Sequence, residues 1–186
     1  MSATSQATSR TLTIAEFEAL PEDGQKHELL WGELISVSPS YRHGLLQSRV
    51  ISALTVYVED HGLGDVVTET AINLPTEPPS VLIPDVAFVR ADAAPPADQQ
   101  VRRYSSTVPD LVVEVISPSE TTRSIRTKVT AYLDHGVGIV VLVYPESRQI
   151  ALWSTGQTPR VLGRNDSLNF DGVVPGFALS LTLLFR

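Results

Sequence analysis

One stretch of the sequence constrains the fold most strongly: PDLVVEVISPSE, at residues 109–120. Side chains alternate between the two faces of a strand, and from 111 to 116 both faces are apolar except at Glu114. A strand that is apolar on both faces belongs in the middle of a sheet. An ionised carboxylate in that position is costly unless it is paired, protonated or bound to a metal ion. Glu114 therefore requires a chemical explanation.

A second apolar run, VLIPDVAFV at residues 81–89, contains the same anomaly, because Asp85 follows Pro84 directly. Two carboxylates that converge form a hard oxygen site for Mg²⁺ or Mn²⁺. These ions usually take one or two protein carboxylates and bind phosphate oxygens through their open positions. We expect Asp85 and Glu114 to lie on neighbouring strands and to share an ion. The structural alternative is that Glu114 is a buried acid satisfied by backbone donors or an arginine, and that Asp85 only begins a strand.

A basic residue is expected near this pair. The segment after the Glu114 strand has helical periodicity from about 121 to Gly136, and Lys128 lies at the edge of its apolar face. A strand rises about 3.3 Å and a helix about 1.5 Å per residue, so Lys128 returns to within about one turn of the level of Glu114. Its ammonium group would stabilise charge on a phosphate or hold a water molecule. The alternative is an ordinary solvated lysine.

The remaining pattern predicts an α+β fold with a mixed β-sheet and helices packed on it. Thr13 and Glu16 form a capping box for a short helix, a hairpin turns at Gly32, and a long helix follows Ser40. In that helix we expect His43 to be a surface or cap residue. Further strands are expected in seven apolar runs, at residues 65–74, 81–89, 110–117, 138–145, 149–154, 160–163 and 177–185. We expect residues 90–109 to form a mobile surface loop.

Composition limits the function classes. We expect residues 1–11 to be a disordered tail and residues 12–186 to form a single domain, large enough for a real core. There is no cysteine, which excludes disulfides and thiolate metal sites. The N-terminus lacks the apolar segment of a signal peptide and no stretch is long enough to span a bilayer, so we expect a cytoplasmic protein without membrane contact. The net charge of −7 argues against a broad basic surface for nucleic acid.

Several motifs together resemble the Uma-two family of restriction-endonuclease-like proteins, a branch of the PD-(D/E)XK nuclease superfamily. The resemblance runs from Thr13 to Phe185 and rests on the order and spacing of these pieces: HELLWGELI, HGLLQSRVISAL, PDVAFV, PDLVVEVISPS, KVTAYLDHGV and VPGFALSL. It implies a restriction-endonuclease-like core and Mg²⁺-dependent (or Mn²⁺-dependent) endonuclease activity, with DNA as the substrate.

The resemblance also implies residue roles. Asp85 and Glu114 would be the acidic metal ligands, the Val115 carbonyl a further ligand, and Lys128 the positively charged catalytic residue. In the superfamily the lysine usually stands two residues after the acid. Here Ile116 holds that place, and the resemblance implies that the role has moved to Lys128.

Two acids of the hairpin, Glu28 and Glu33, match an early acidic motif of the family, and either is a candidate for the site. The chain departs from the family at Tyr144, where an acid normally precedes the proline at the end of a strand. If that acid supports the site, activity would suffer. The alternative function is therefore an inactive nuclease fold that serves as a binding or oligomerisation module. Two tryptophans and the apolar run FALSLTLLF further predict a homodimer.

Overall fold

The computed structural model describes residues 11–186, so the predicted disordered tail lies outside them except for its last residue. The mixed α+β fold is confirmed. Its centre is a six-stranded sheet in the order β10-β9-β8-β7-β6-β3, in which only β7 and β8 run parallel. The strands are β3 (Gly64–Val67), β6 (Val86–Arg90), β7 (Leu111–Val115), β8 (Ile139–Tyr144), β9 (Gln149–Trp153) and β10 (Arg160–Leu162).

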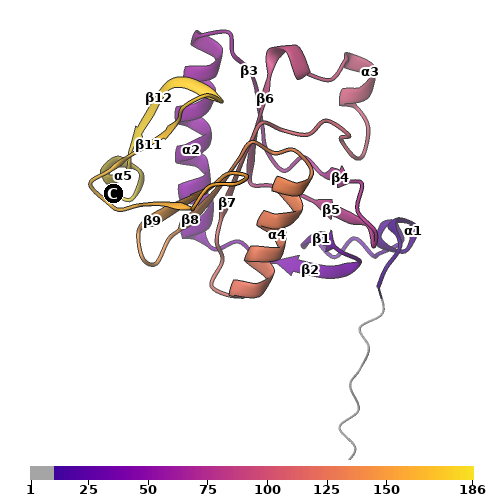
Figure 1. The fold of residues 1–186 in the computed structure, drawn as a ribbon. Helices are drawn as coiled ribbons and strands as arrows, with labels where there is room; N and C mark the ends of the chain where they lie inside the picture. The colour runs from indigo at the N-terminus through magenta and orange to yellow at the C-terminus, as the bar shows by residue number, and fades with distance from the viewer. Residues whose placement is uncertain (1–10) are drawn as a thin grey trace, which may run out of the picture.

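Two long helices cover opposite faces of this sheet (Figure 1). Helix α2 (Tyr41–Asp60) packs on the face of β7 that carries Val113, and helix α4 (Thr122–Asp134) packs on the face that carries Val112. The N-caps are Ser40 and Thr121, and each side-chain oxygen accepts a backbone N–H of the first turn. Glu114 shares its face with Val112, so the sequence places the acid beneath α4.

A smaller four-stranded sheet, in the order β2-β1-β5-β4, lies beside the first. Its apolar residues extend the core beneath α4, and the short helix α1 covers it with Phe17. The predicted capping box of α1 is present, since Thr13 and Glu16 exchange hydrogen bonds. These elements are α1 (Ile14–Glu18), β1 (Lys26–Leu30), β2 (Glu33–Val37), β4 (Ile72–Leu74) and β5 (Ser80–Leu82).

Two predicted strands are each divided between the sheets. The run 81–89 breaks into β5 and β6 because Pro84 has no N–H to donate to a strand ladder. The run 65–74 breaks into β3 and β4 at Glu69, which has a left-handed backbone with φ +51°. The break at Pro84 determines the position of Asp85, which lies in the crossing between the two sheets, directly before β6.

Two further predictions were wrong in part. The expected loop at 90–109 contains two short helices, η1 (Ala91–Ala93) and α3 (Ala97–Gln100). The C-terminal run ends as a helix, since β12 (Val174–Ser180), which pairs with β11 (Ser167–Phe170), is followed by α5 (Leu181–Leu184). This unit packs against α2 and buries Phe177 and Leu181 in the core. The apolar C-terminus is therefore used within one chain, and the homodimer stays a prediction.

Candidate active site

Glu114 is buried near the C-terminal end of β7 and faces α4. Its Oε1 accepts a hydrogen bond of 2.8 Å from the hydroxyl of Tyr132, and the ammonium group of Lys128 lies 3.5 Å from the same oxygen. The pKa of Glu114 is raised to about 8, chiefly by burial; the charge of Lys128 opposes this shift, and the negative charge of Asp85 adds to it. The two proposed ligands are thus close enough to repel each other.

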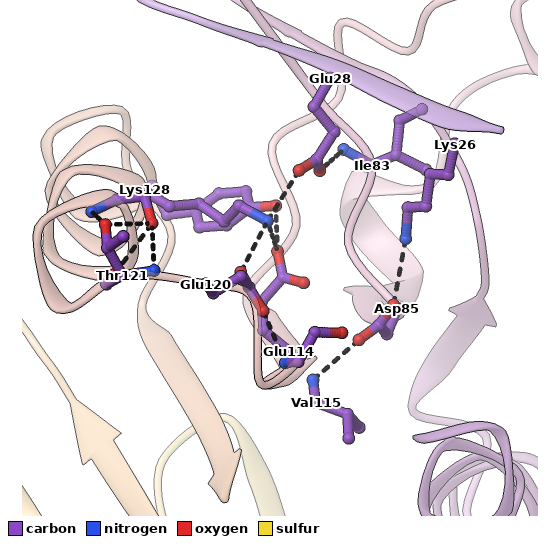
Figure 2. A network of polar contacts seen from close by, with 12 residues as sticks. Lys26, Glu28, Ile83, Asp85, Glu114, Val115, Glu120, Thr121 and Lys128 are labelled. Atoms are coloured by element: carbon purple, nitrogen blue, oxygen red, sulfur yellow. Dashed lines mark hydrogen bonds and ion pairs between the residues drawn. The ribbon is translucent and has the colours of Figure 1, made fainter. Parts of the chain in front are cut away.

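Lys128 is buried in α4 rather than solvated, and its ammonium group points into the site (Figure 2). Its shortest contact is with Glu28, whose Oε2 lies 2.8 Å from Nζ. The other oxygen of Glu28 accepts the backbone N–H of Ile83 at 2.7 Å, so this fully buried carboxylate is fixed at both ends. Burial lowers the pKa of Lys128, but the charges of Glu114 and Glu28 outweigh it and raise the pKa well above its usual value.

Asp85 is almost completely buried and is held by three donors. Its Oδ1 lies 3.0 Å from Nζ of Lys26 and 3.2 Å from Nε2 of His43, and its Oδ2 accepts the backbone N–H of Val115 at 2.7 Å. Burial raises the pKa of Asp85, but the hydrogen bond from His43 and the charge of Lys26 outweigh it and leave the pKa below its usual value. Asp85 is therefore ionised at neutral pH.

The bond from Val115 also locates the proposed carbonyl ligand. Within an extended strand the N–H and C=O of one residue point to the same edge, so the Val115 carbonyl faces the side of β7 where Asp85 lies. The structure thus brings together Asp85, Glu114, Lys128 and the early acid Glu28. The other candidate, Glu33, is exposed at the start of β2, and no contact joins it to these acids among the described residues.

Tyr144 stands at the end of β8 and is partly buried against the apolar residues beneath α4. Burial raises its pKa, and the charge of Glu120 raises it further. Glu120 in turn accepts the backbone N–H of Ser117 at 2.7 Å and lies 4.0 Å from Nζ of Lys128. The position where the family carries an acid therefore borders the loop of Glu120 and is not among the residues that contact Asp85 or Glu114.

The charges in this cluster do not balance. Two ammonium groups face the carboxylates of Glu28, Glu69, Asp85 and Glu120, together with Glu114, whose raised pKa favours its protonated form at neutral pH. A divalent cation would relieve this excess, and the two acids with the Val115 carbonyl supply the hard oxygen donors that Mg²⁺ accepts. No group of three or more His, Cys, Asp or Glu side chains within residues 11–186 is arranged to hold a metal ion alone. The donors fit an ion that takes two carboxylates and completes its shell with carbonyl and water oxygens.

Sequence reasoning missed the three side chains that contact Asp85 or Glu114 directly, other than Lys128. Lys26 and Tyr132 occupy ordinary positions in amphipathic segments, and no motif distinguishes them. The prediction for His43 was wrong in part: its backbone N–H joins the Ser40 cap, but its side chain is not at the surface and is buried against Asp85, because α2 presents it to the sheet. Its Nε2 faces Asp85, and its Nδ1 has no hydrogen-bond partner in the described part of the chain.

Comparisons with known proteins identify the family and the fold of the chain. A family model, Uma2, described as "Putative restriction endonuclease", matches residues 14–182. The chain belongs to the Uma2 family. Among solved structures, a crystal structure from Anabaena variabilis ATCC 29413, described as "a putative nuclease belonging to DUF820", superposes with a TM-score of 0.83. It is 20% identical in sequence, and the match covers 94% of this chain and 97% of that chain, which establishes a shared fold. None of the curated proteins compared with the chain matches it significantly.

The residues that the Uma2 model matches include the separate segments that form the cluster. The matched range includes β1, the crossing at Asp85, β7 and α4, which are the elements that supply the acids and the lysine. Helix α2, inside the same range, contributes His43 to Asp85. No helix in residues 11–186 is both long and apolar enough to cross a bilayer.

Proposed function

We propose that this Uma2 protein is a Mg²⁺-dependent (or Mn²⁺-dependent) endonuclease that hydrolyses phosphodiester bonds of DNA. The observation that supports it most is the meeting of two buried acids, Asp85 and Glu114, with a buried lysine in one cluster that carries an excess of negative charge. Family membership supports a nuclease and so a hydrolase. The ion, the DNA substrate and the residue roles are our proposal.

Asp85, Glu114 and the Val115 carbonyl would hold the ion. When bound, a divalent cation supplies Lewis acidity toward a phosphate oxygen and lowers the pKa of a bound water molecule. The chain's own residues orient these ligands. His43 and the Val115 N–H fix the carboxylate of Asp85, and the Tyr132 hydroxyl fixes that of Glu114.

Lys128 would act on the phosphate or on the attacking water. Its ammonium group stays protonated because Glu28 and Glu114 stabilise the charge, so it serves as a fixed cation and hydrogen-bond donor rather than as a base. Glu28 is a positioning residue in this scheme, since it aims Nζ at the site through the 2.8 Å ion pair.

DNA would contact only a small part of the surface, because the chain carries a net charge of −7. Arg123 and Arg126 are exposed on α4, the helix that supplies Lys128, and would pair with backbone phosphates near the site. These contacts carry no sequence information by themselves.

A nicking assay on supercoiled plasmid DNA, with Mg²⁺ or Mn²⁺ and with EDTA, tests the proposal. Wild type should nick in the presence of the ion, and Glu114→Gln should not, because the amide cannot replace an anionic ligand. Glu33→Gln removes an equivalent charge from an exposed position and is the matched control, which should cleave normally. If wild type neither bound the ion nor cleaved DNA, the inactive binding or oligomerisation module would be favoured instead.

A further inference from the structure

The oxygens of Asp85 are already engaged by donors of the chain itself. Lys26 and His43 both bond to Oδ1, and the Val115 N–H bonds to Oδ2. A carboxylate oxygen offers about two lone pairs, so Oδ1 has no free acceptor site. A divalent cation that approaches Asp85 also meets the positive charge of Lys26, 3.0 Å from the carboxylate. Oδ2 accepts only the Val115 N–H and can still bind an ion, but Asp85 becomes a stronger ligand once a competing donor leaves Oδ1.

Of the three donors, Lys26 is the one that is free to move. The Val115 N–H belongs to the central strand of the sheet, and the imidazole of His43 is enclosed, with 5% of its side chain exposed. The side chain of Lys26 is 17% exposed and ends in a flexible four-carbon stem. Lys26 keeps its charge throughout: burial lowers its pKa, but Asp85 and the neighbouring acids raise it above the usual value.

A second acceptor for Lys26 is in place beside Asp85. Oε2 of Glu69 lies 3.1 Å from Nζ, and this carboxylate is half exposed. Gln47 fixes its position by donating from Nε2 to Oε1 of Glu69 at 2.9 Å and to the Asp85 carbonyl at 3.1 Å. The left-handed φ of +51° at Glu69 is uncommon for a residue other than glycine, and such conformations cluster at functional sites.

We propose that Lys26 is a displaceable internal counter-ion of Asp85, which a divalent cation drives onto Glu69 when it binds. Lys26 is thus a positioning residue that tunes metal affinity, and Glu69 is its receiver. The exchange needs no rearrangement of the backbone, because Nζ already contacts both carboxylates. This inference rests on the proposed function, since it takes Asp85 as a metal ligand.

Mn²⁺ affinity measured at fixed pH, by the electron paramagnetic resonance signal of the free ion, tests the exchange. Lys26→Met removes the competing charge and should tighten Mn²⁺ binding by at least about tenfold, since a nearby opposite charge shifts a carboxylate equilibrium by about 1–3 pKa units. Glu69→Gln removes the receiver and should weaken binding several-fold. In the K26M background, Glu69→Gln should leave the Mn²⁺ affinity unchanged. A double-mutant cycle measures this difference between the two backgrounds as a coupling between Lys26 and Glu69.

The cycle separates the exchange from simpler roles. If Glu69 attracted the ion directly, Glu69→Gln would weaken binding equally in both backgrounds, and the inference would be overturned. It would also be overturned if Lys26→Met bound Mn²⁺ no more tightly than wild type while its circular dichroism stayed native. Lys26→Gln is the second variant if Lys26→Met does not fold, and the same tightening is expected from it.

Mn²⁺ binding by wild type and by Glu114→Gln shows separately whether the metal site exists. Wild type that binds Mn²⁺ together with Glu114→Gln that does not would support the metal site, so an unchanged K26M would then refute the exchange alone. If neither wild type nor K26M bound Mn²⁺, both the proposed function and the exchange would fail.

Discussion

Replacing Glu114 by glutamine should stabilise the protein in the absence of divalent ions, and the gain should grow with pH. The pKa of Glu114 is raised from 4.5 to about 8, first by burial and then by the negative charges of Asp85 and Glu28, against the opposing charges of Lys128 and Lys26. An acid whose pKa is raised by folding contributes stability that is fully present below the pKa of the unfolded state. That stability is lost as pH rises through the pKa of the folded state.

The size of the loss follows from the shift. Each pKa unit corresponds to about 1.4 kcal/mol, so between pH 5 and pH 8 wild type should lose roughly 4 kcal/mol relative to Glu114→Gln. For a domain of this length that difference equals roughly 8 to 16 °C in melting temperature. The lowered pKa of Asp85 and the raised pKa values of the two lysines act outside this window, at lower and higher pH.

Melting curves of wild type, Glu114→Gln and the control Glu33→Gln, measured in EDTA from pH 5 to pH 8, provide the assay. The melting temperatures of the two glutamine variants should diverge steadily as pH rises, because Glu33 is exposed and its substitution removes no buried charge. Mn²⁺ at pH 8 should then raise the melting temperature of wild type and leave Glu114→Gln unchanged, since binding to the folded state stabilises it. A Glu114→Gln protein that melts below wild type at pH 8 would refute the reasoning and make Glu114 a structural acid.

Three further outcomes are expected. Lys128→Met should destabilise the fold, because it leaves Glu28 without its cation. At a temperature where the variant stays folded it should retain Mn²⁺ binding and lose at least about 100-fold in nicking rate, because the cation acts on phosphate or water; loss of binding by the folded variant would place Lys128 in the metal site. Tyr132→Phe should remove the hydrogen bond to Glu114 and cost about 1 kcal/mol in chemical unfolding, with an unchanged core; no loss would mean that the bond is not formed. Gly64→Ala should destabilise strongly by the same assay, since a Cβ there would clash with the Val89 carbonyl at φ +146°; a neutral result would contradict the close approach of β3 and β6.

Much of the fold was predictable because local signals agree with it. The capping box at Thr13, the Ser40 cap and the apolar faces of the two long helices all follow from short-range chemistry. The division of strands between two sheets was not predictable from periodicity, since Pro84 and Glu69 redirect the chain only in the context of neighbouring strands. The final apolar run has no breaker between its strand and its helix, so a single strand was the natural expectation.

The site shows the same limit. Asp85 and Glu114 stand out because an acid within an apolar run is anomalous, and Glu28 follows from the family resemblance. Lys26, His43 and Tyr132 give no such signal, because a lysine, histidine or tyrosine within an amphipathic element is common in any protein. Their partners come from other segments, between 18 and 59 residues away, and only tertiary structure brings them together.

The location of the lysine also has a physical reason. Glu114 points to the face of β7 that α4 covers, and Ile116, two residues later, shares that face and packs into the apolar cluster beneath α4. A lysine at 116 would have to share this apolar environment, whereas Lys128 approaches from the helix above and meets Glu28 from β1 as well as Glu114. The helix thus supplies a cation with two carboxylate partners.

The double variant Lys128→Ile with Ile116→Lys moves the lysine to position 116 and should leave Glu28 buried without its cation. We therefore expect it to destabilise the fold by several kcal/mol, as the loss of one partner in a buried pair does. Chemical unfolding of the double variant measures this cost, and stability equal to wild type would show that position 116 serves the acids equally well.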